Sequence, residues 1–417
     1  MLERDVAWET YRWVRCRTED LAAPLAPEDQ VVQPMPDASP TKWHLAHTSW
    51  FFEEFLLSSF LESYRPFHPL FGYLFNSYYE AAGPHQPRPL RGLLSRPTVA
   101  ETLCYRGHVD AAMADLIGNT AAWNRAGPLV ELGLHHEQQH QELILTDIMY
   151  MLSCNPLRPA YHAIEDDEGP AAGASSTWIA FPGGVTAIGD AGSGFAFDNE
   201  RPRHPVLVPP FRLASRPVTN REFVTFIDDG GYREPRHWLS EGWDAVREHG
   251  WRAPLYWEPA PDGGWLAFTL AGLRPLEPAA PVCHVSFFEA AAYAAWAGAR
   301  LPTEAEWEVA AATLPADEMT AFDGVRLEPR PALRGPGLAQ MFGAVWQWTA
   351  SPYTPYPGFR PAAGAVGEYN GKFMINQIVL RGSSCVTPPR HIRPTYRNFF
   401  PPAARWQFTG LRLALDS

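Results

Sequence analysis

The sequence predicts an α+β protein in which an N-terminal four-helix bundle precedes a mixed, loop-rich domain. Residues 1–153 contain long segments whose apolar residues recur at helical spacing, whereas residues 178–417 contain short apolar runs broken by Gly and Pro. Residues 154–177 are rich in Pro, Gly, Ala and acidic residues, which is typical of a linker. We therefore expect two domains, at 1–153 and 178–417, joined by the linker 154–177.

The predicted bundle has a first helix from about residue 6. The other three are expected within 43–61, 98–117 and 128–152. Pro97 and Pro128 stand at two helix starts, where the missing N–H of proline costs nothing. The C-terminal domain is expected to contain helical pieces only at 219–228 and 286–299.

Composition excludes several classes of protein. A formal net charge of −12 gives no basic footprint for nucleic acid, and no run of 18 apolar residues could span a membrane. The five cysteines are widely spaced and form no CxxC pattern, so reduced thiols are expected. These features predict a cytoplasmic protein that binds neither nucleic acid nor membranes.

Three histidines interrupt the apolar faces of two predicted helices. His136 and His140 are four residues apart and therefore lie on one helical face, which also carries Asp147. His47 lies in the middle of the apolar stripe of an earlier helix. Such inward imidazoles are the parts of a metal site in a bundle core, although a buried His is more often a hydrogen-bonded core residue. His44 and His135, which are offset from the stripes, are outer-shell or surface residues in this interpretation.

Five motifs carry a resemblance to a known family. The stretches "SPTKWHLAHTSWFFEEF" and "HHEQQHQELILTD" resemble the DinB-like bundle of the ergothioneine-biosynthetic sulfoxide synthases. The stretches "LPTEAEWE", "VWQWTAS" and "VLRGSSC" resemble the formylglycine-generating-enzyme fold, a C-type-lectin-like domain. The order of the two domains matches the sulfoxide synthases over nearly the whole chain.

The resemblance implies a mononuclear Fe(II) held by His47, His136 and His140. The family joins the sulfur of a thiol to the imidazole C2 of hercynine (N-α-trimethylhistidine) and uses O2 to oxidise that sulfur to a sulfoxide. Three neutral ligands leave positions open for substrates and O2. A non-catalytic metal- and ligand-binding protein is the alternative from another class. Formylglycine generation is disfavoured, because only Cys385 stands in the region where that activity needs a close cysteine pair.

Several candidate substrate-binding residues follow from the same resemblance. Gln139 matches a glutamine that hydrogen-bonds the substrate imidazole, and Asn398 matches an asparagine near the trimethylammonium and carboxylate end of hercynine. A quaternary ammonium has no N–H, so aromatic faces suit it. The rings that could serve, although aromatics in this fold are usually core, are Trp346, Trp348, Phe399 and Phe400.

The reaction also needs a proton donor, for which tyrosine is suited. Tyr78 and Tyr79 resemble the paired tyrosines of one subgroup of the family, and we favour them. A second subgroup takes its tyrosine from the C-terminal domain, where Tyr356 and Tyr369 are the nearest candidates.

The donor pocket departs from the better-known pattern. Members that accept γ-glutamylcysteine carry Asp and Arg where this chain has Phe400 and Ala404. Losing a charged anchor costs about 1.5–3 kcal/mol. We therefore predict free cysteine as the donor, with its carboxylate bound by Arg88 and Arg91. A selenosugar, as used by the selenoneine synthase branch, is the second option, and γ-glutamylcysteine the third.

Overall fold

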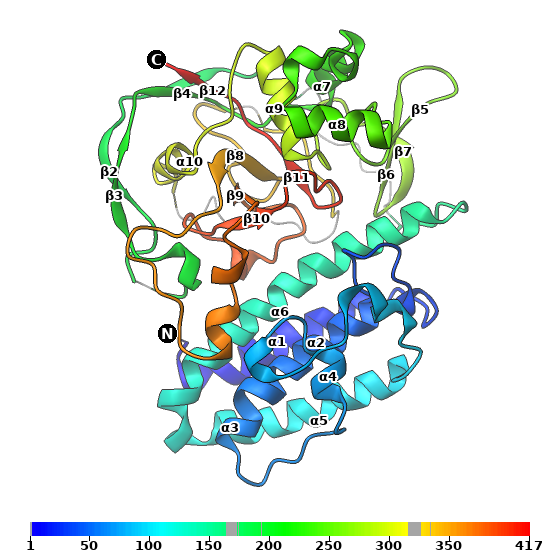
Figure 1. Ribbon diagram of the computed structural model, residues 1–417, viewed down its shortest axis with the longest axis vertical. Coiled ribbons are helices and arrows are strands. Elements are labelled where there is room, and N and C mark those ends of the chain that lie inside the picture. The colour runs from blue at the N-terminus through cyan, green and yellow to red at the C-terminus, as the bar shows by residue number, and fades with distance from the viewer. Residues whose placement is uncertain (1, 164–172, 174, 193, 316–326, 334) are drawn as a thin grey trace. The chain divides into compact units, whose positions relative to one another are not determined.

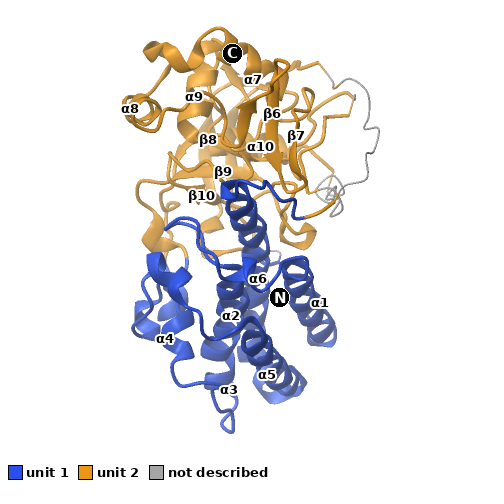
Figure 2. Cartoon of the chain, turned by 90° about the vertical axis from the view of Figure 1, so that its right-hand side faces the viewer, with its two compact units in different colours: residues 1–161, 192–195, 361–369 blue, residues 162–191, 196–360, 370–417 orange. Residues whose placement is uncertain are grey.

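The computed structural model describes every residue except 1, 164–172, 174, 193, 316–326 and 334. The chain forms two compact units, which Figure 2 shows in different colours. Unit 1 comprises residues 1–161, 192–195 and 361–369, and unit 2 comprises residues 162–191, 196–360 and 370–417. Two short segments from later in the chain thus belong to the N-terminal unit, which the sequence did not indicate. The expected linker, 154–177, lies partly outside the described residues.

Unit 1 is built on four long helices (Figure 1), which are α1 (Arg4–Ala22), α2 (Thr41–Phe52), α5 (Val99–Gly118) and α6 (Thr120–Cys154). Helix α2 continues into a π-helical turn, Glu53–Leu57, and then into α3 (Ser58–Phe60). The aromatic connection that follows contains α4 (Phe71–Phe75) and two short 3₁₀ turns, Glu80–Ala82 and Arg88–Leu93. Helix α2 packs against both α5 and α6, and α1 packs against α6.

Helices α5 and α6 begin at different kinds of N-terminal cap. Helix α5 begins directly after Pro97, where Thr98 and Glu101 form a reciprocal capping box. The expectation that Pro128 starts a helix is wrong, because α6 already begins at Thr120 and Pro128 lies inside it. The Asn119 side chain accepts the N–H of Ala121 and caps this earlier start.

The described residues of unit 2 form four small sheets. The first has the order β1–β4–β12, the second β10–β9–β8–β11, the third β2–β3 and the fourth β5–β6–β7. All strand pairs are antiparallel except β11 with β8. The strands are β1 (Trp178–Phe181), β2 (Gly184–Ile188), β3 (His204–Val208), β4 (Phe211–Ala214), β5 (Trp257–Pro259), β6 (Trp265–Thr269), β7 (Gly272–Pro275), β8 (Trp346–Pro352), β9 (Ile378–Gly382), β10 (Asn398–Phe400), β11 (Thr409–Gly410) and β12 (Ala414–Asp416).

Helices flank these sheets at more places than the sequence suggested. The expected pieces are α7 (Asn220–Asp228) and α9 (Phe287–Trp296). The expectation of helix only at these places is wrong, because α8 (Ser240–His249) and α10 (Glu304–Ala311) also form. Helix α10 is short but has a Thr303–Glu306 capping box, a signal present in the sequence.

The two signature motifs of the C-terminal half meet in the core of unit 2. Trp307, from "LPTEAEWE", is fully buried and donates its indole N–H to Gln347 of "VWQWTAS" at 3.0 Å. Arg412 donates to the same amide oxygen at 2.9 Å. These residues therefore hold the fold together, and the helical unit followed by a sheet-containing unit confirms the α+β class.

No helix among the described residues combines the length and apolarity needed to cross a bilayer.

Candidate metal centre and substrate site

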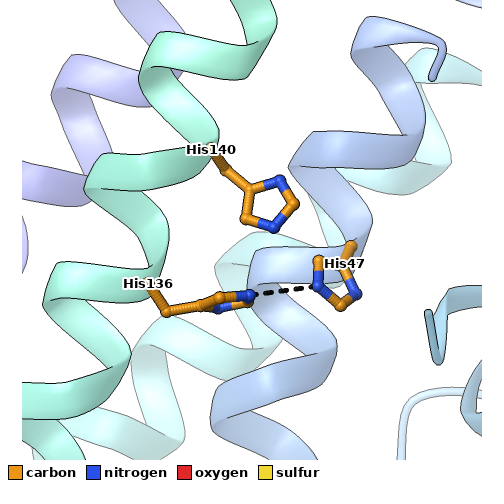
Figure 3. A group of neighbouring side chains, drawn as sticks. All are labelled: His47, His136 and His140. Carbon is orange, nitrogen blue, oxygen red and sulfur yellow. Dashed lines mark hydrogen bonds between the residues drawn. The ribbon is translucent and has the colours of Figure 1, made fainter. Parts of the chain in front are cut away.

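Three imidazoles converge in the bundle centre. His47 comes from α2, and His136 and His140 come from successive turns of α6 (Figure 3). All three are buried, and one ring nitrogen from each lies within 4.8 Å of the others. This is the only such group of potential metal ligands among the residues that the structure describes. The i, i+4 spacing on α6 and the histidine on the facing helix are what bring the rings together.

The hydrogen bond of His47 leaves a ring nitrogen whose lone pair could bind a cation. The Nδ1 of His47 lies 2.6 Å from the carbonyl oxygen of Phe75, so Nδ1 donates and Nε2 carries a lone pair. That Nε2 faces the Nε2 of His136 at 3.2 Å. Two imidazole lone pairs repel at this distance unless a proton or a metal ion lies between them. The donor set therefore fits a divalent transition metal that prefers imidazole ligands.

Burial keeps the three imidazoles neutral. Loss of solvation lowers the pKa of His136 to about 3, and it lowers the pKa of His47 and His140 well below the usual range. A neutral imidazole has a lone pair to donate, so all three side chains are in a metal-binding form at neutral pH.

Aromatic and cationic groups fix the position of His47. Its ring stacks on Trp43, with centroids 4.6 Å apart, and on Trp50, with centroids 5.4 Å apart. The guanidinium of Arg91 lies 3.4 Å from the centroid of the Trp43 ring. The layers Arg91, Trp43 and His47 therefore restrict how the imidazole can turn.

The two spare histidines have different roles in packing. His44 is buried and contacts both His140 and Asp147. His135 instead stacks on Phe195, with centroids 3.7 Å apart, in one of the late segments of unit 1. Asp147 interacts with His44 and with the Ser39 N–H, and it is not part of the three-histidine group.

Three tyrosines lie near one another in unit 1, and one of them, Tyr369, lies beside His136. The Tyr369 ring is 5.7 Å from the His136 ring, and its hydroxyl donates to the side-chain oxygen of Gln139. Tyr78 donates to the carbonyl of Tyr369 at 3.4 Å. The rings of Tyr78 and Tyr79 stack with centroids 4.5 Å apart, and their hydroxyl oxygens are 3.5 Å apart. Candidate tyrosines from both ends of the sequence thus gather in unit 1.

Burial raises the pKa of Tyr79 well above its usual value. Its hydroxyl therefore stays protonated at neutral pH and has a proton to give. The Tyr79 side chain is fully buried, whereas that of Tyr78 is half-buried.

Comparisons with known proteins agree with this geometry. Residues 10–144 match the DinB superfamily, and residues 167–323 and 334–417 match the sulfatase-modifying factor enzyme 1-like domain. A protein of Mycolicibacterium thermoresistibile named hercynine oxygenase is 39% identical over 314 residues, which cover 67% of each chain. The hercynine oxygenase of Mycolicibacterium smegmatis is 38% identical over 68% of this chain and 71% of its own. The chain belongs to the ergothioneine sulfoxide synthase family.

The C-terminal part also has relatives of another activity. A formylglycine-generating enzyme of Streptomyces coelicolor is 34% identical over 52% of this chain and 82% of its own. This match covers about half of the chain, whereas each of the two hercynine oxygenases matches about two thirds of it.

The two arginines expected at the donor differ in environment. Arg91 is buried and donates to the Ser39 hydroxyl at 2.9 Å, whereas Arg88 is exposed and donates to the carbonyl of Asp37. Loss of solvation lowers the pKa of Arg91. Both arginines were predicted to bind the carboxylate of the donor, because spacing alone did not distinguish them.

The remaining candidates lie in unit 2. Asn398, Phe399 and Phe400 form β10, which pairs with β9 in the sheet that also contains Trp346 on β8. Phe399 stacks on Tyr353, with centroids 4.1 Å apart, and Trp346 is buried against Tyr396.

Tyr356, the other C-terminal candidate, has its interaction partners within unit 2. Its hydroxyl donates to Glu304 at 3.3 Å, and the guanidinium of Arg397 lies 3.9 Å from its ring centroid. Of the two C-terminal candidates, Tyr369 therefore belongs to the unit that carries the histidines.

The segment 361–369 had no sequence signal for its place beside the bundle. Glu368 holds it there, because its carboxylate accepts the N–H groups of Glu80 at 3.0 Å and of Ala81 at 2.9 Å. These two residues directly follow Tyr79.

Proposed function

We propose that this protein is an Fe(II)- and O2-dependent sulfoxide synthase that joins hercynine to a thiol donor, with free cysteine as the donor. The observation that carries the proposal is the buried three-histidine group with a tyrosine and glutamine cluster beside it. The names of the relatives from two Mycolicibacterium species support hercynine as the substrate. His47, His136 and His140 would hold the metal. When bound, Fe(II) supplies open coordination positions and the redox chemistry that O2 requires.

The reaction balances with one O2. Hercynine loses the hydrogen on C2 and the thiol loses its hydrogen, a C–S bond forms, one oxygen atom is transferred to sulfur, and the other leaves as water. The protein must therefore manage protons next to the substrates. Tyr78 and Tyr79 are our proposed donors, and Tyr369 is the alternative. Gln139 would hold the substrate imidazole, and Asn398 with the rings of Trp346, Phe399 and Phe400 would hold its trimethylammonium and carboxylate end.

The donor assignment rests on the absent dipeptide anchor. Phe400 is apolar, and Ala404 is buried in unit 2. The neighbouring Arg405 is engaged with Glu289 at 2.8 Å and with the carbonyl of Ala253. Arg91, together with Arg88, would bind the carboxylate of cysteine. A selenosugar remains the alternative donor, because it needs no clamp for an amino acid.

Formylglycine generation receives no support from the cysteines of unit 2. Cys283 and Cys385 are buried and form no disulfide, and burial raises the pKa of the Cys283 thiol. A thiol that stays protonated is a poor nucleophile and a poor metal ligand.

Product analysis tests the proposal. The Fe(II)-loaded protein is incubated with O2, hercynine, and equal amounts of cysteine, γ-glutamylcysteine and a selenosugar, and the products are identified by mass spectrometry. We expect a hercynyl-cysteine sulfoxide. A selenium–carbon adduct would move the protein to the selenoneine branch. The absence of any adduct, together with stoichiometric metal that consumes no O2, would favour a non-catalytic binding protein.

A further inference from the structure

We propose that His44 and Asp147 position His140 through a hydrogen-bonded relay that sets its tautomer. This inference rests on the proposed function in so far as His140 is a metal ligand. The Nδ1 of His140 lies 2.8 Å from the Nδ1 of His44, and the Nε2 of His44 lies 3.1 Å from the Oδ2 of Asp147. All three side chains are buried, so water does not compete for these contacts.

The direction of the relay is fixed at its far end by the main chain. The Ser39 N–H donates to the Oδ2 of Asp147 at 2.8 Å. A backbone N–H can only donate, so this oxygen is an acceptor. A carboxylate oxygen can accept two hydrogen bonds, and in the relay the Nε2 of His44 donates the second one to this oxygen.

The remaining protons follow from this assignment. With its ring hydrogen on Nε2, His44 has a lone pair on Nδ1. The Nδ1 of His140 must then donate to it, which leaves the lone pair of His140 on Nε2. This is the nitrogen that can turn toward His47 and His136. The relay thus holds His140 in the one tautomer that can bind a metal through Nε2.

The three candidate ligands differ in the partner of their Nδ1 atom. His47 donates to a carbonyl, that of Phe75, whereas the Nδ1 of His136 has no hydrogen-bond partner among the described residues. Only His140 is connected, through His44, to a carboxylate. A donor hydrogen bond toward a negative group makes an imidazole more electron-rich, so His140 should be the strongest of the three ligands.

The same chain of contacts continues to Arg91. The Ser39 hydroxyl accepts from Arg91 at 2.9 Å, while the Ser39 N–H holds Asp147. Ser39 thus connects the only carboxylate of the relay to a buried guanidinium. This arrangement fixes the orientation of the Asp147 carboxylate, because its Oδ2 contacts both the Ser39 N–H and the Nε2 of His44.

Two substitutions separate a relay from simple packing. His44→Leu keeps the volume of the side chain but removes the acceptor for His140. His44→Asn is smaller, but its amide oxygen can stand where Nδ1 stood. We expect His44→Leu to weaken anaerobic Co(II) binding by about 10–100-fold and His44→Asn to bind nearly as the wild type does. If His44 only fills space, the order of the two variants reverses, and the relay is wrong.

A control and a spectroscopic readout complete the test. Gln141→Leu removes a buried amide next to His140, one that contacts Val14 and Thr18 and no histidine, and it should leave Co(II) affinity unchanged. In ¹⁵N-histidine NMR spectra of the Zn(II)-loaded protein, we expect a hydrogen on Nε2 of His44 and on Nδ1 of His140. Hydrogens on both nitrogens of His44 would overturn the relay alone. A wild-type protein that binds no divalent metal would overturn both the relay and the proposed function.

Discussion

Tyr369 donates a hydrogen bond from its hydroxyl to the side-chain oxygen of Gln139, although the two residues are 230 positions apart in the sequence. The bond fixes the rotation of the glutamine amide, so its NH2 group points away from Tyr369. If Gln139 holds the substrate imidazole, Tyr369 positions it for that contact. A late segment of the chain thereby helps to shape a site built on α6.

Tyr369→Phe should therefore affect substrate binding more than chemistry. A lost neutral hydrogen bond is worth about 0.5–1.5 kcal/mol, so we expect the KM for hercynine to rise roughly 2–12-fold. Steady-state kinetics with varied hercynine measures this change. A large fall in kcat at unchanged KM would instead make Tyr369 the proton donor.

Tyr78→Phe and Tyr79→Phe test the favoured donors. Each variant keeps the ring and removes the hydroxyl, so hercynine binding should persist. Loss of a general acid typically costs about 10²–10⁴-fold in rate. We expect slower sulfoxide formation or a changed product, measured by O2 uptake and mass spectrometry on the same samples. Wild-type behaviour of both variants would transfer the role to Tyr369.

His140→Ala should abolish both iron binding and turnover, because it removes one of three ligands and the partner of His44. Metal content after anaerobic loading with Fe(II) is the measurement. His135→Ala is the matched control, since that imidazole stacks on Phe195 and is outside the three-histidine group. Stoichiometric iron in His140→Ala would remove this residue from the ligand set.

Arg91→Met and Arg88→Met distinguish the two donor arginines. A charge-assisted hydrogen bond is worth about 1.5–3 kcal/mol, so Arg91→Met should raise the KM for cysteine by roughly 10–150-fold. Arg88 is exposed, and we expect a smaller increase from its loss. Steady-state kinetics at saturating hercynine checks both values. Equal effects would support a bidentate role shared by the two side chains.

How far the sequence could predict this site depends on how local each signal is. The i, i+4 spacing of His136 and His140 is a property of one helix, so it could be read directly. His47 could be predicted as a third ligand because it lies in the apolar stripe of a second predicted helix. Tyr369 reaches unit 1 because Glu368 binds the backbone of Glu80 and Ala81. Such a contact between distant segments leaves no periodic pattern in the sequence.

Burial was equally hard to predict for single residues. Arg88 and Arg91 lie in one short 3₁₀ turn, yet Arg88 is exposed whereas Arg91 is buried and lies over the Trp43 ring. His44 was expected to be outer-shell or surface, and only the packing of α2 against α6 brings it to Asp147. Whether a polar residue is structural or functional depends on such contacts between elements.

Glu137, which follows His136 on α6, is a fully buried carboxylate of the bundle. It accepts from Arg15 and from Arg106, each at 3.0 Å, and all three side chains are buried. Burial alone would raise its pKa, but the two guanidinium groups lower the pKa of Glu137 to about 2. Glu137→Gln would leave two buried cations without this partner and should cost about 3–5 kcal/mol of stability. Thermal unfolding measures the loss, with Glu9→Gln on the exposed face of α1 as the control.

His284 in unit 2 should make stability depend on pH. Burial lowers its pKa to about 3, whereas an exposed imidazole titrates near 6.5. The unfolded chain therefore binds the extra proton first as the pH falls, and the folded state loses stability below about pH 6.5. At pH 5 this residue should cost about 2 kcal/mol relative to pH 7.5. Its φ of 62° suits asparagine, so His284→Asn should fold and should lower the difference in Tm between pH 7.5 and pH 5. If the wild type and His284→Asn lose the same Tm over this range, His284 is not a group that destabilises the fold at acidic pH.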